Sequence, residues 1–211
     1  MQKRLVRKLD LEMAISAVAP HPSPKAHLEQ YTITPEVAAE ILYMATYIYN
    51  DIIGKTVIDL GCGTGRLAIA AALLDAKEVV GIDIDKTAIK QAIKNAEKLG
   101  VIAKIDWIIA DIDAVRGSFD TVVQNPPFGV QKRRADRKFL EKALSIGRRV
   151  YSLHKASDSS FLKAFIGKNN GETKAVYALS MRIPYMFKFH RKQKHQFSVN
   201  LYVIERKEPQ K

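Results

Sequence analysis

The alternation of short apolar runs with helical segments after Thr56 is the feature that most constrains the fold of this chain. Strand-like runs cover residues 56–60, 79–83, 106–109, 121–124 and 150–153, and helix-like segments cover 67–74, 86–98 and 136–148. The runs are almost continuously apolar, which is typical of strands in a parallel sheet that is covered on both faces. Right-handed crossovers between such strands predict a doubly wound, Rossmann-like α/β fold.

The two ends of the chain predict additions to this core. Residues 174–182 and 197–205 are strand-like runs joined by a long basic connection, and we expect them to pair antiparallel at one edge. A helix over 2–18 precedes a Pro-rich linker at 20–24, and Thr34 with Pro35 begins a helix that ends near Tyr49. The prediction is one domain of about seven mostly parallel strands, with a helical extension and linker (1–27), a core (28–155) and a C-terminal helix and strands (156–211).

Composition narrows the function. Lys and Arg number 34 against 22 Asp and Glu, and this net charge of +12 favours contact with phosphate backbones over a merely solubilising surface. Two basic runs, at 132–138 and 188–195, are the expected contacts. The RNA-binding residues we predict in them are Lys132, Arg133, Arg134, Lys188, His190, Arg191 and Lys192.

Other classes are disfavoured by what the sequence lacks. Cys62 is the only cysteine, so no internal disulfide and no cysteine cluster for zinc can form, and we expect no metal. No apolar run approaches the roughly 18 residues that span a bilayer. The N-terminus has no apolar signal-peptide region, which predicts a cytoplasmic location.

A glycine loop follows the first predicted strand, with the sequence Asp-Leu-Gly-Cys-Gly-Thr-Gly over 59–65. Its glycines let backbone amides approach a ligand closely. Asp83 and Asp111 end the next two strands, where carboxylates can accept hydrogen bonds from ribose hydroxyls and an adenine amino group. Asp85 is the expected cap of the helix at 86–98. The acidic residue Asp59, just before the glycine loop, suits a cofactor with a cationic amino acid and sulfonium end, so S-adenosylmethionine is favoured over a dinucleotide. Cys62 has no neighbouring base that would make it a nucleophile, and we interpret it as a packing residue.

The fourth predicted strand ends in Asn-Pro-Pro-Phe at 125–128. Because parallel strands carry their ligands at their carboxyl ends, Asn125 should face the glycine loop. The Asn125 side chain and the rigid Pro126 carbonyl can hold the two N6 hydrogens of adenine, and Phe128 can stack on the base. We therefore predict that Asn125, Pro126, Pro127 and Phe128 perform methyl transfer by positioning an aromatic amine; an ordinary Pro-rich turn is the alternative.

These residues resemble class I methyltransferases that act on amino nitrogens, and more narrowly the methyltransferase-like five family. The resemblance extends from Leu28-Glu29-Gln30-Tyr31 through the motifs above to Val-Tyr-Ser-Leu-His-Lys at 150–155 and Lys-Phe-His at 188–190. It implies a class I fold, S-adenosylmethionine as cofactor and N6-methyladenosine in small-subunit ribosomal RNA as product. With the loop and strand-end positions, the predicted cofactor-binding residues are Gln30, Ile33, Asp59, Gly61, Gly63, Thr64, Gly65, Asp83, Ile84, Asp111, Ile112 and Asn125. Ile33 departs from the threonine that relatives can have, so a side-chain hydrogen bond is lost there.

The resemblance also implies a partner, a small zinc-binding activator subunit that adds to the edge of the sheet. The third strand should be that edge, with Ile105, Trp107 and Ile109 on it, although Trp107 could instead pack under a helix. Two other functions stay open: methylation of glutamine N5 in a protein, and a non-catalytic RNA-binding role in ribosome assembly.

Overall fold

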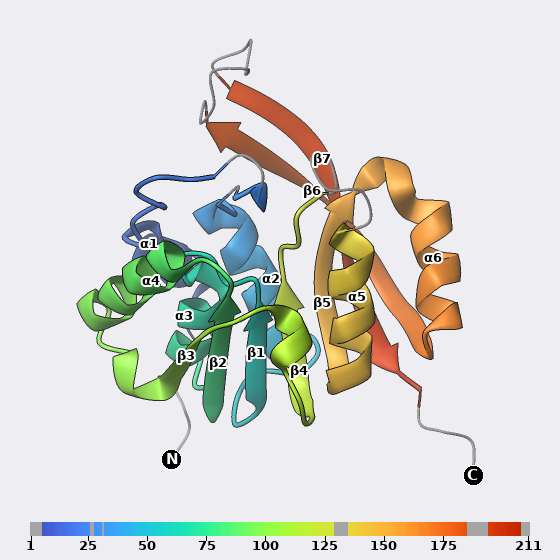
Figure 1. The fold of residues 1–211 in the computed structure, drawn as a ribbon, viewed down its shortest axis with the longest axis horizontal. Helices are drawn as coiled ribbons and strands as arrows, with labels where there is room; N and C mark the ends of the chain where they lie inside the picture. Colours follow the sequence, from blue (N-terminus) through green and yellow to red (C-terminus); the bar gives the residue numbers. More distant parts are fainter. Residues whose placement is uncertain (1–5, 26–27, 31, 129–134, 185–193, 208–211) are drawn as a thin grey trace.

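The computed structural model describes residues 6–25, 28–30, 32–128, 135–184 and 194–207. Seven strands form one sheet in the order β3-β2-β1-β4-β5-β7-β6 (Figure 1). Their bounds are β1 Thr56–Leu60, β2 Glu78–Asp83, β3 Ile105–Ile109, β4 Phe119–Gln124, β5 Gly147–Lys155, β6 Gly171–Pro184 and β7 Lys194–Arg206. Strands β1 to β5 are parallel, and β7 lies antiparallel between β5 and β6. The predicted doubly wound sheet with an antiparallel C-terminal pair is confirmed.

Helices cover both faces of the sheet. They are α1 Lys8–Ser16, α2 Pro35–Tyr47, α3 Arg66–Leu73, α4 Lys86–Lys98, α5 Ala135–Ile146 and α6 Ser159–Lys168, with short 3-10 turns η2 Ile102–Lys104, η3 Ile112–Ala114 and η4 Ala156–Asp158. One apolar core joins α1, α2 and α3 to the sheet, and a second joins α5 and α6 to the opposite face. Within the described part of the chain, no helix has both the length and the apolar character needed to cross a membrane.

Local sequence explains where α2 begins, whereas several other predicted boundaries were wrong. Thr34 caps α2, accepting a hydrogen bond from the Val37 amide, with Pro35 at the first helical position. Among the described residues the N-terminal helix begins only at Lys8 and ends at Ser16. The helix predicted to reach residue 148 ends at Ile146, because Gly147 already lies in β5, so close to Val122 that a Cβ would stand 2.4 Å from its side chain.

The last two strands form an arm that extends past the rest of the sheet. Pairing of β5 with β7 ends at Lys155 and Val199, whereas β6 and β7 stay paired out to Pro184 and Lys194. The arm therefore overhangs the carboxyl ends of the parallel strands (Figure 1). Residues 185–193, and with them the predicted RNA contacts Lys188, His190, Arg191 and Lys192, lie outside the described residues.

Strand β3 is the predicted edge, but its side chains are arranged differently from the prediction. Ile105 is buried, and the Trp107 ring packs inward over Gly65 and Gly81. The exposed apolar residues are Ile108 and Ile109, at 42% and 49%, and as successive residues of a strand they point to opposite faces of the sheet. The alternative reading of Trp107, as a packing residue, is the correct one.

Candidate active site

The glycine loop joins β1 to α3 beneath a cavity at the carboxyl edge of the sheet. The amides of Gly61 and Cys62 both donate to the Ile82 carbonyl at 2.9 Å, which ties the loop to β2. The three glycines have positive φ, and Gly65 caps α3 at φ 86°. Gly61 lies so close to the ring of Phe139 that a Cβ would stand 2.8 Å from it. The loop therefore needs glycine both for its turn and for its packing.

Two alanine substitutions separate these requirements. Gly63→Ala should cost about 1–2 kcal/mol for the left-handed backbone, because a Cβ there meets no atom within 4 Å. Gly65→Ala should lose about 1–3 kcal/mol more, because its Cβ would stand 2.6 Å from the Trp107 ring. Urea unfolding of both variants measures the difference. Equal losses would show that the indole yields freely and does not fix the loop.

Asp83 and Asp85 organise the wall of the cavity beside the loop. Asp83 ends β2 and accepts hydrogen bonds from the amides of Gly63 and Asp85, both at 2.8 Å. Burial raises the pKa of Asp83 against the lowering effect of these two amides. Asp85 caps α4 through the Thr87 amide at 2.9 Å, which is the role predicted for it.

Asp85 also anchors the segment that precedes α2. It is 4% exposed, yet it accepts a hydrogen bond from Gln30 Nε2 at 2.8 Å and lies 3.2 Å from Lys25 Nζ and 3.3 Å from His21 Nε2. Burial would raise the pKa of Asp85, but the hydrogen bonds from Gln30, Thr87 and Lys25 outweigh it and hold the pKa below the usual range. Gln30 lines the cavity from this anchored position.

Arg66 makes a second attachment for the same segment. Its buried guanidinium donates to the carbonyls of Val18 and Ile33. Burial lowers the pKa of Arg66, and both acceptors are neutral carbonyls. Asn95 adds two hydrogen bonds to the backbone of Ala19 and one to the Thr64 carbonyl. Val18, Ala19 and Ile33 are thus held in place beside the cavity.

Asp59 is the most deeply buried carboxylate of the cavity, at 1% exposed. Its Oδ2 accepts a hydrogen bond from the Ala68 amide at 3.1 Å, while its Oδ1 accepts none from the described residues. Burial raises the pKa of Asp59 to about 8. A buried acceptor in this condition favours a cationic ligand, because a positive group would restore the charged carboxylate.

Asp111 lies at the mouth of the cavity and is held by a lysine. Its Oδ1 accepts from the Asp113 amide at 2.9 Å and pairs with Lys138 Nζ at 2.8 Å. Lys138, on α5, also lies 2.9 Å from Asp113 Oδ2. Hydrogen bonding to Asp111 is the largest effect on Lys138 and raises its pKa. Lys138 therefore links α5 to the loop after β3 across the rim of the cavity.

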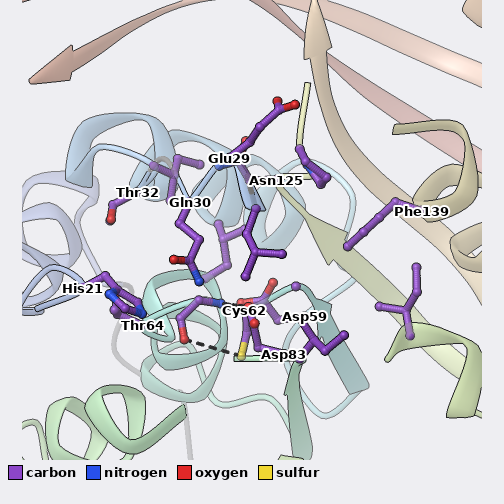
Figure 2. Close-up of a pocket in the computed structure, with 18 of the residues that line it drawn as sticks. His21, Glu29, Gln30, Thr32, Asp59, Cys62, Thr64, Asp83, Asn125 and Phe139 are labelled. Atoms are coloured by element: carbon purple, nitrogen blue, oxygen red, sulfur yellow. Dashed lines mark hydrogen bonds between the residues drawn. The ribbon is translucent and has the colours of Figure 1, made fainter. Parts of the chain in front are cut away.

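Asn125 enters the cavity from the end of β4, opposite the loop and its carboxylates. Figure 2 shows it across the cavity from Asp59, Cys62 and Asp83. Pro127 lines the cavity too, whereas Pro126 is buried. Phe128 is half-buried, and Lys155 Nζ lies 6.0 Å from the centre of its ring. The Asn-Pro-Pro-Phe segment thus begins beside the glycine loop, as predicted from the parallel sheet.

Most of the predicted site residues converge on this one cavity. Those that line it are Gln30, Ile33, Asp59, Gly61, Gly63, Thr64, Asp83, Ile84, Asp111, Ile112, Asn125 and Pro127. Gly65, Pro126 and Phe128 do not line it, and the Trp107 ring lies against Gly65. The predicted RNA contacts Lys132, Arg133 and Arg134 lie outside the described residues.

The lining residues that were not predicted include His21, Glu29, Lys138 and Phe139. His21 lies in the predicted Pro-rich linker, and Lys138 lies in the basic run at 132–138. Glu29 lies in the Leu-Glu-Gln-Tyr sequence at 28–31, in which a role is predicted only for Gln30. Three of them reach the cavity through contacts between elements that are distant in the sequence, which leave no local signal: His21 with Asp85, Lys138 with Asp111 and Phe139 with Gly61.

Comparisons with known proteins agree with this geometry. A family model described as a methyltransferase domain matches residues 53–173. An uncharacterized protein of Methanocaldococcus jannaschii is 41% identical over 96% of this chain and 95% of its own length. The rRNA N(6)-adenosine-methyltransferase METTL5 of Danio rerio is 36% identical over 90% of this chain and 95% of its own.

A solved structure shares the whole architecture. The crystal structure of a Pyrococcus horikoshii protein, provisionally described as an RNA methyltransferase, superimposes with a TM-score of 0.89 at 36% identity and covers 97% of this chain and 100% of the other. The matched domain includes the glycine loop, both strand-end aspartates and Asn125. The chain therefore belongs to the methyltransferase-like five family of class I methyltransferases.

Proposed function

We propose that this protein methylates N6 of an adenine in small-subunit ribosomal RNA, with S-adenosylmethionine as methyl donor. One observation carries the proposal: a single cavity brings the buried carboxylate of Asp59 and the strand-end Asp83 opposite Asn125. The name of the Danio rerio relative supports adenine N6 in ribosomal RNA as the target. The small subunit follows from the family resemblance, and a cytoplasmic location is part of the proposal.

The residues present fit the cofactor. Asp59, with its unpaired Oδ1 among the described residues, suits the cationic amino acid end, and Asp83 suits the ribose hydroxyls. Asp111 and Ile112, at the mouth, suit the adenine ring. When bound, the cofactor supplies an electrophilic methyl group on a sulfonium. The protein supplies orientation and shields the reaction from water.

Asn125 and the residues after it hold the methyl acceptor. The lone pair of adenine N6 is delocalised into the ring, so the free amine attacks a methyl group poorly. Accepting both N6 hydrogens, on the Asn125 side chain and the Pro126 carbonyl, favours a tetrahedral nitrogen whose lone pair points to the methyl group. Phe128 stacks on the base, a contact worth about 1–3 kcal/mol. The surplus proton leaves N6 after transfer.

Charge supports RNA as the substrate. The net charge is +12, and the basic residues Lys132, Arg133 and Arg134 follow Phe128 directly in the chain. A second basic run, which contains Lys188, His190, Arg191 and Lys192, joins the two strands of the arm that overhangs the same edge of the sheet. We propose that both runs bind the phosphates around the target nucleotide.

The test is a methyl-transfer assay with labelled S-adenosylmethionine and three acceptors: small-subunit ribosomal RNA, large-subunit ribosomal RNA and a glutamine-containing peptide. We expect label in the small-subunit RNA, recovered as N6-methyladenosine after digestion. Label in the peptide alone would favour glutamine N5 methylation. A protein that binds the RNA but not S-adenosylmethionine, by calorimetry, would favour the assembly-factor function.

We also propose that a small zinc-binding activator subunit adds to edge strand β3. The support is the pair of exposed isoleucines on that strand, Ile108 and Ile109. Ile108→Glu and Ile109→Glu should each weaken the complex at least about tenfold, the usual effect of a charge in an apolar interface centre. Affinity of the purified activator, measured by calorimetry, checks this.

Ile48→Glu provides the matched control for the interface variants. Ile48 is an isoleucine of similar exposure, 62%, at the end of α2 and away from β3. It should leave the affinity unchanged. Unchanged affinity in Ile108→Glu and Ile109→Glu, or an equal loss in Ile48→Glu, would contradict a binding site for the activator on β3.

A further inference from the structure

A buried chain of hydrogen bonds connects β5 to the residue that immediately precedes Asn125. Gln124 is the last residue of β4 and is 1% exposed. Its Nε2 donates to Ser152 Oγ at 2.8 Å, across from it on β5. Ser152 is completely buried, and its Oγ lies 2.7 Å from His154 Nε2. None of these three residues lines the cavity.

The direction of the second hydrogen bond depends on the imidazole tautomer. Ser152 Oγ accepts the hydrogen of Gln124, and its own hydrogen goes to His154 Nε2 when the imidazole carries its proton on Nδ1. The imidazole is 2% exposed, and it packs edge-on against the Tyr202 ring, with centroids 5.7 Å apart at 82°. Packing of this kind fixes the ring and, through Ser152, the Gln124 amide.

The same end of β5 also contacts the far end of the Asn-Pro-Pro-Phe segment. Lys155, next to His154, places its Nζ 6.0 Å from the centre of the Phe128 ring. Residues 152–155 thus contact the residue before Asn125 and the aromatic ring three residues after it. An apolar pair could fill this part of the sheet without the cost of burying polar groups, and Gln124 Oε1 accepts no hydrogen bond from the described residues. This arrangement is poorly explained by stability alone.

We propose that Ser152 and His154 are positioning residues for methyl transfer, which hold the end of β4 so that Asn125 and Pro126 meet the amine in reactive geometry. This inference rests on the proposed function. Neither residue touches the reactants. Their effect is expected on the turnover rate and not on cofactor affinity, because a misplacement of about 1 Å can lower a rate about 100-fold.

Two substitutions of His154 distinguish positioning from packing. His154→Phe keeps a ring against Tyr202 and removes the hydrogen-bonding nitrogen, whereas His154→Gln keeps a hydrogen-bonding group near the place of Nε2 and removes the ring. We expect kcat to fall about 10- to 100-fold for His154→Phe and for Ser152→Ala, and about threefold or less for His154→Gln. The double variant Ser152→Ala/His154→Phe should be no slower than Ser152→Ala, because both remove the same chain.

Thr121→Val is the matched control. Thr121 is a buried hydroxyl on the same strand, β4, and it donates to the Asp51 carbonyl at 2.5 Å, away from the cavity. Its loss should lower the melting temperature and leave kcat unchanged. For every variant, calorimetry with S-adenosylmethionine should give a Kd within about twofold of wild type, which also shows that the variant is folded.

The results separate the two proposals. Wild-type protein that labels RNA while His154→Phe turns over as fast as His154→Gln, or faster, would contradict the positioning role and leave the proposed function standing. Loss of cofactor affinity in step with kcat would also contradict it, because the chain would then support the cavity as a whole. Wild-type protein that transfers no methyl group to RNA would overturn both.

Discussion

Asn125→Ala is expected to lower kcat for RNA methylation by about 1,000-fold, while the Kd for S-adenosylmethionine stays within about twofold of wild type. Removing one preorganised hydrogen-bonding group from a transition state costs about 100- to 1,000-fold in rate. We expect a loss at the upper end of this range for Asn125→Ala, because the Asn125 oxygen must hold the N6 nitrogen in tetrahedral geometry when its lone pair attacks the methyl group. Only the transition state demands this geometry, so binding of the cofactor should not change. Single-turnover assays with labelled cofactor, together with calorimetry, measure the two quantities separately.

Asn125→Asp is the informative companion. A carboxylate keeps an acceptor at the same position, so part of the activity, about 1–10% of wild type, should survive if the role of Asn125 is to accept a hydrogen from N6. Two results would contradict the mechanism. Activity of Asn125→Ala near the wild-type rate would show that the Pro126 carbonyl suffices alone. If both variants were equally inactive and bound the cofactor more weakly, Asn125 would have a structural role in lining the cavity and no role in accepting the N6 hydrogen.

The fold could be predicted from the sequence wherever the pattern was long and periodic. Strand β1 and helix α4 begin and end where they were predicted, because Asp85 caps α4 and the glycine loop ends β1. Boundaries failed where packing decided them. The predicted helix at 136–148 includes Gly147, which instead begins β5 and packs against Val122. No window of local sequence contains that contact.

The candidate site divides in the same way. The glycine loop, Asp83 and Asn125 could be predicted to converge, because the carboxyl ends of parallel strands meet at one edge. The side-chain pairs that stabilise the wall and the rim of the cavity could not be predicted from the sequence. Gln30 reaches Asp85 across 55 residues, and Lys138 reaches Asp111 across 27. Such contacts depend on how distant segments are arranged in the fold and on the length of a side chain, neither of which leaves a periodic signal.

Burial of Asp59 in the cavity lowers the free energy of unfolding of the ligand-free protein at neutral and alkaline pH. A carboxyl group whose pKa is about 8 in the folded protein and near the ordinary value of 3.8 in the unfolded chain binds its proton more tightly when folded. The contribution of Asp59 to the unfolding free energy is therefore fully present below pH 4 and is lost as the pH rises from 4 to 8. Above pH 8 the unfolding free energy stays lower by this amount. The folded protein then holds a charged carboxylate that is incompletely hydrogen-bonded. A bound cation would restore the lost unfolding free energy by pairing with this carboxylate.

Asp59→Asn should consequently stabilise the free protein and weaken the cofactor complex. The amide carries no charge to desolvate, so the melting temperature of the variant relative to that of wild type should rise steadily from pH 5 to pH 8. At pH 8 the unfolding free energy of the variant should exceed that of wild type by about 1–3 kcal/mol. The Kd for S-adenosylmethionine should rise about 10- to 100-fold at pH 8, the equivalent of a charge-assisted hydrogen bond. Scanning calorimetry across pH and titration calorimetry at pH 8 check the two effects. A melting-temperature difference that does not change with pH would mean that Asp59 is already ionised at pH 5, and it would remove the electrostatic reason for a cationic ligand beside the glycine loop.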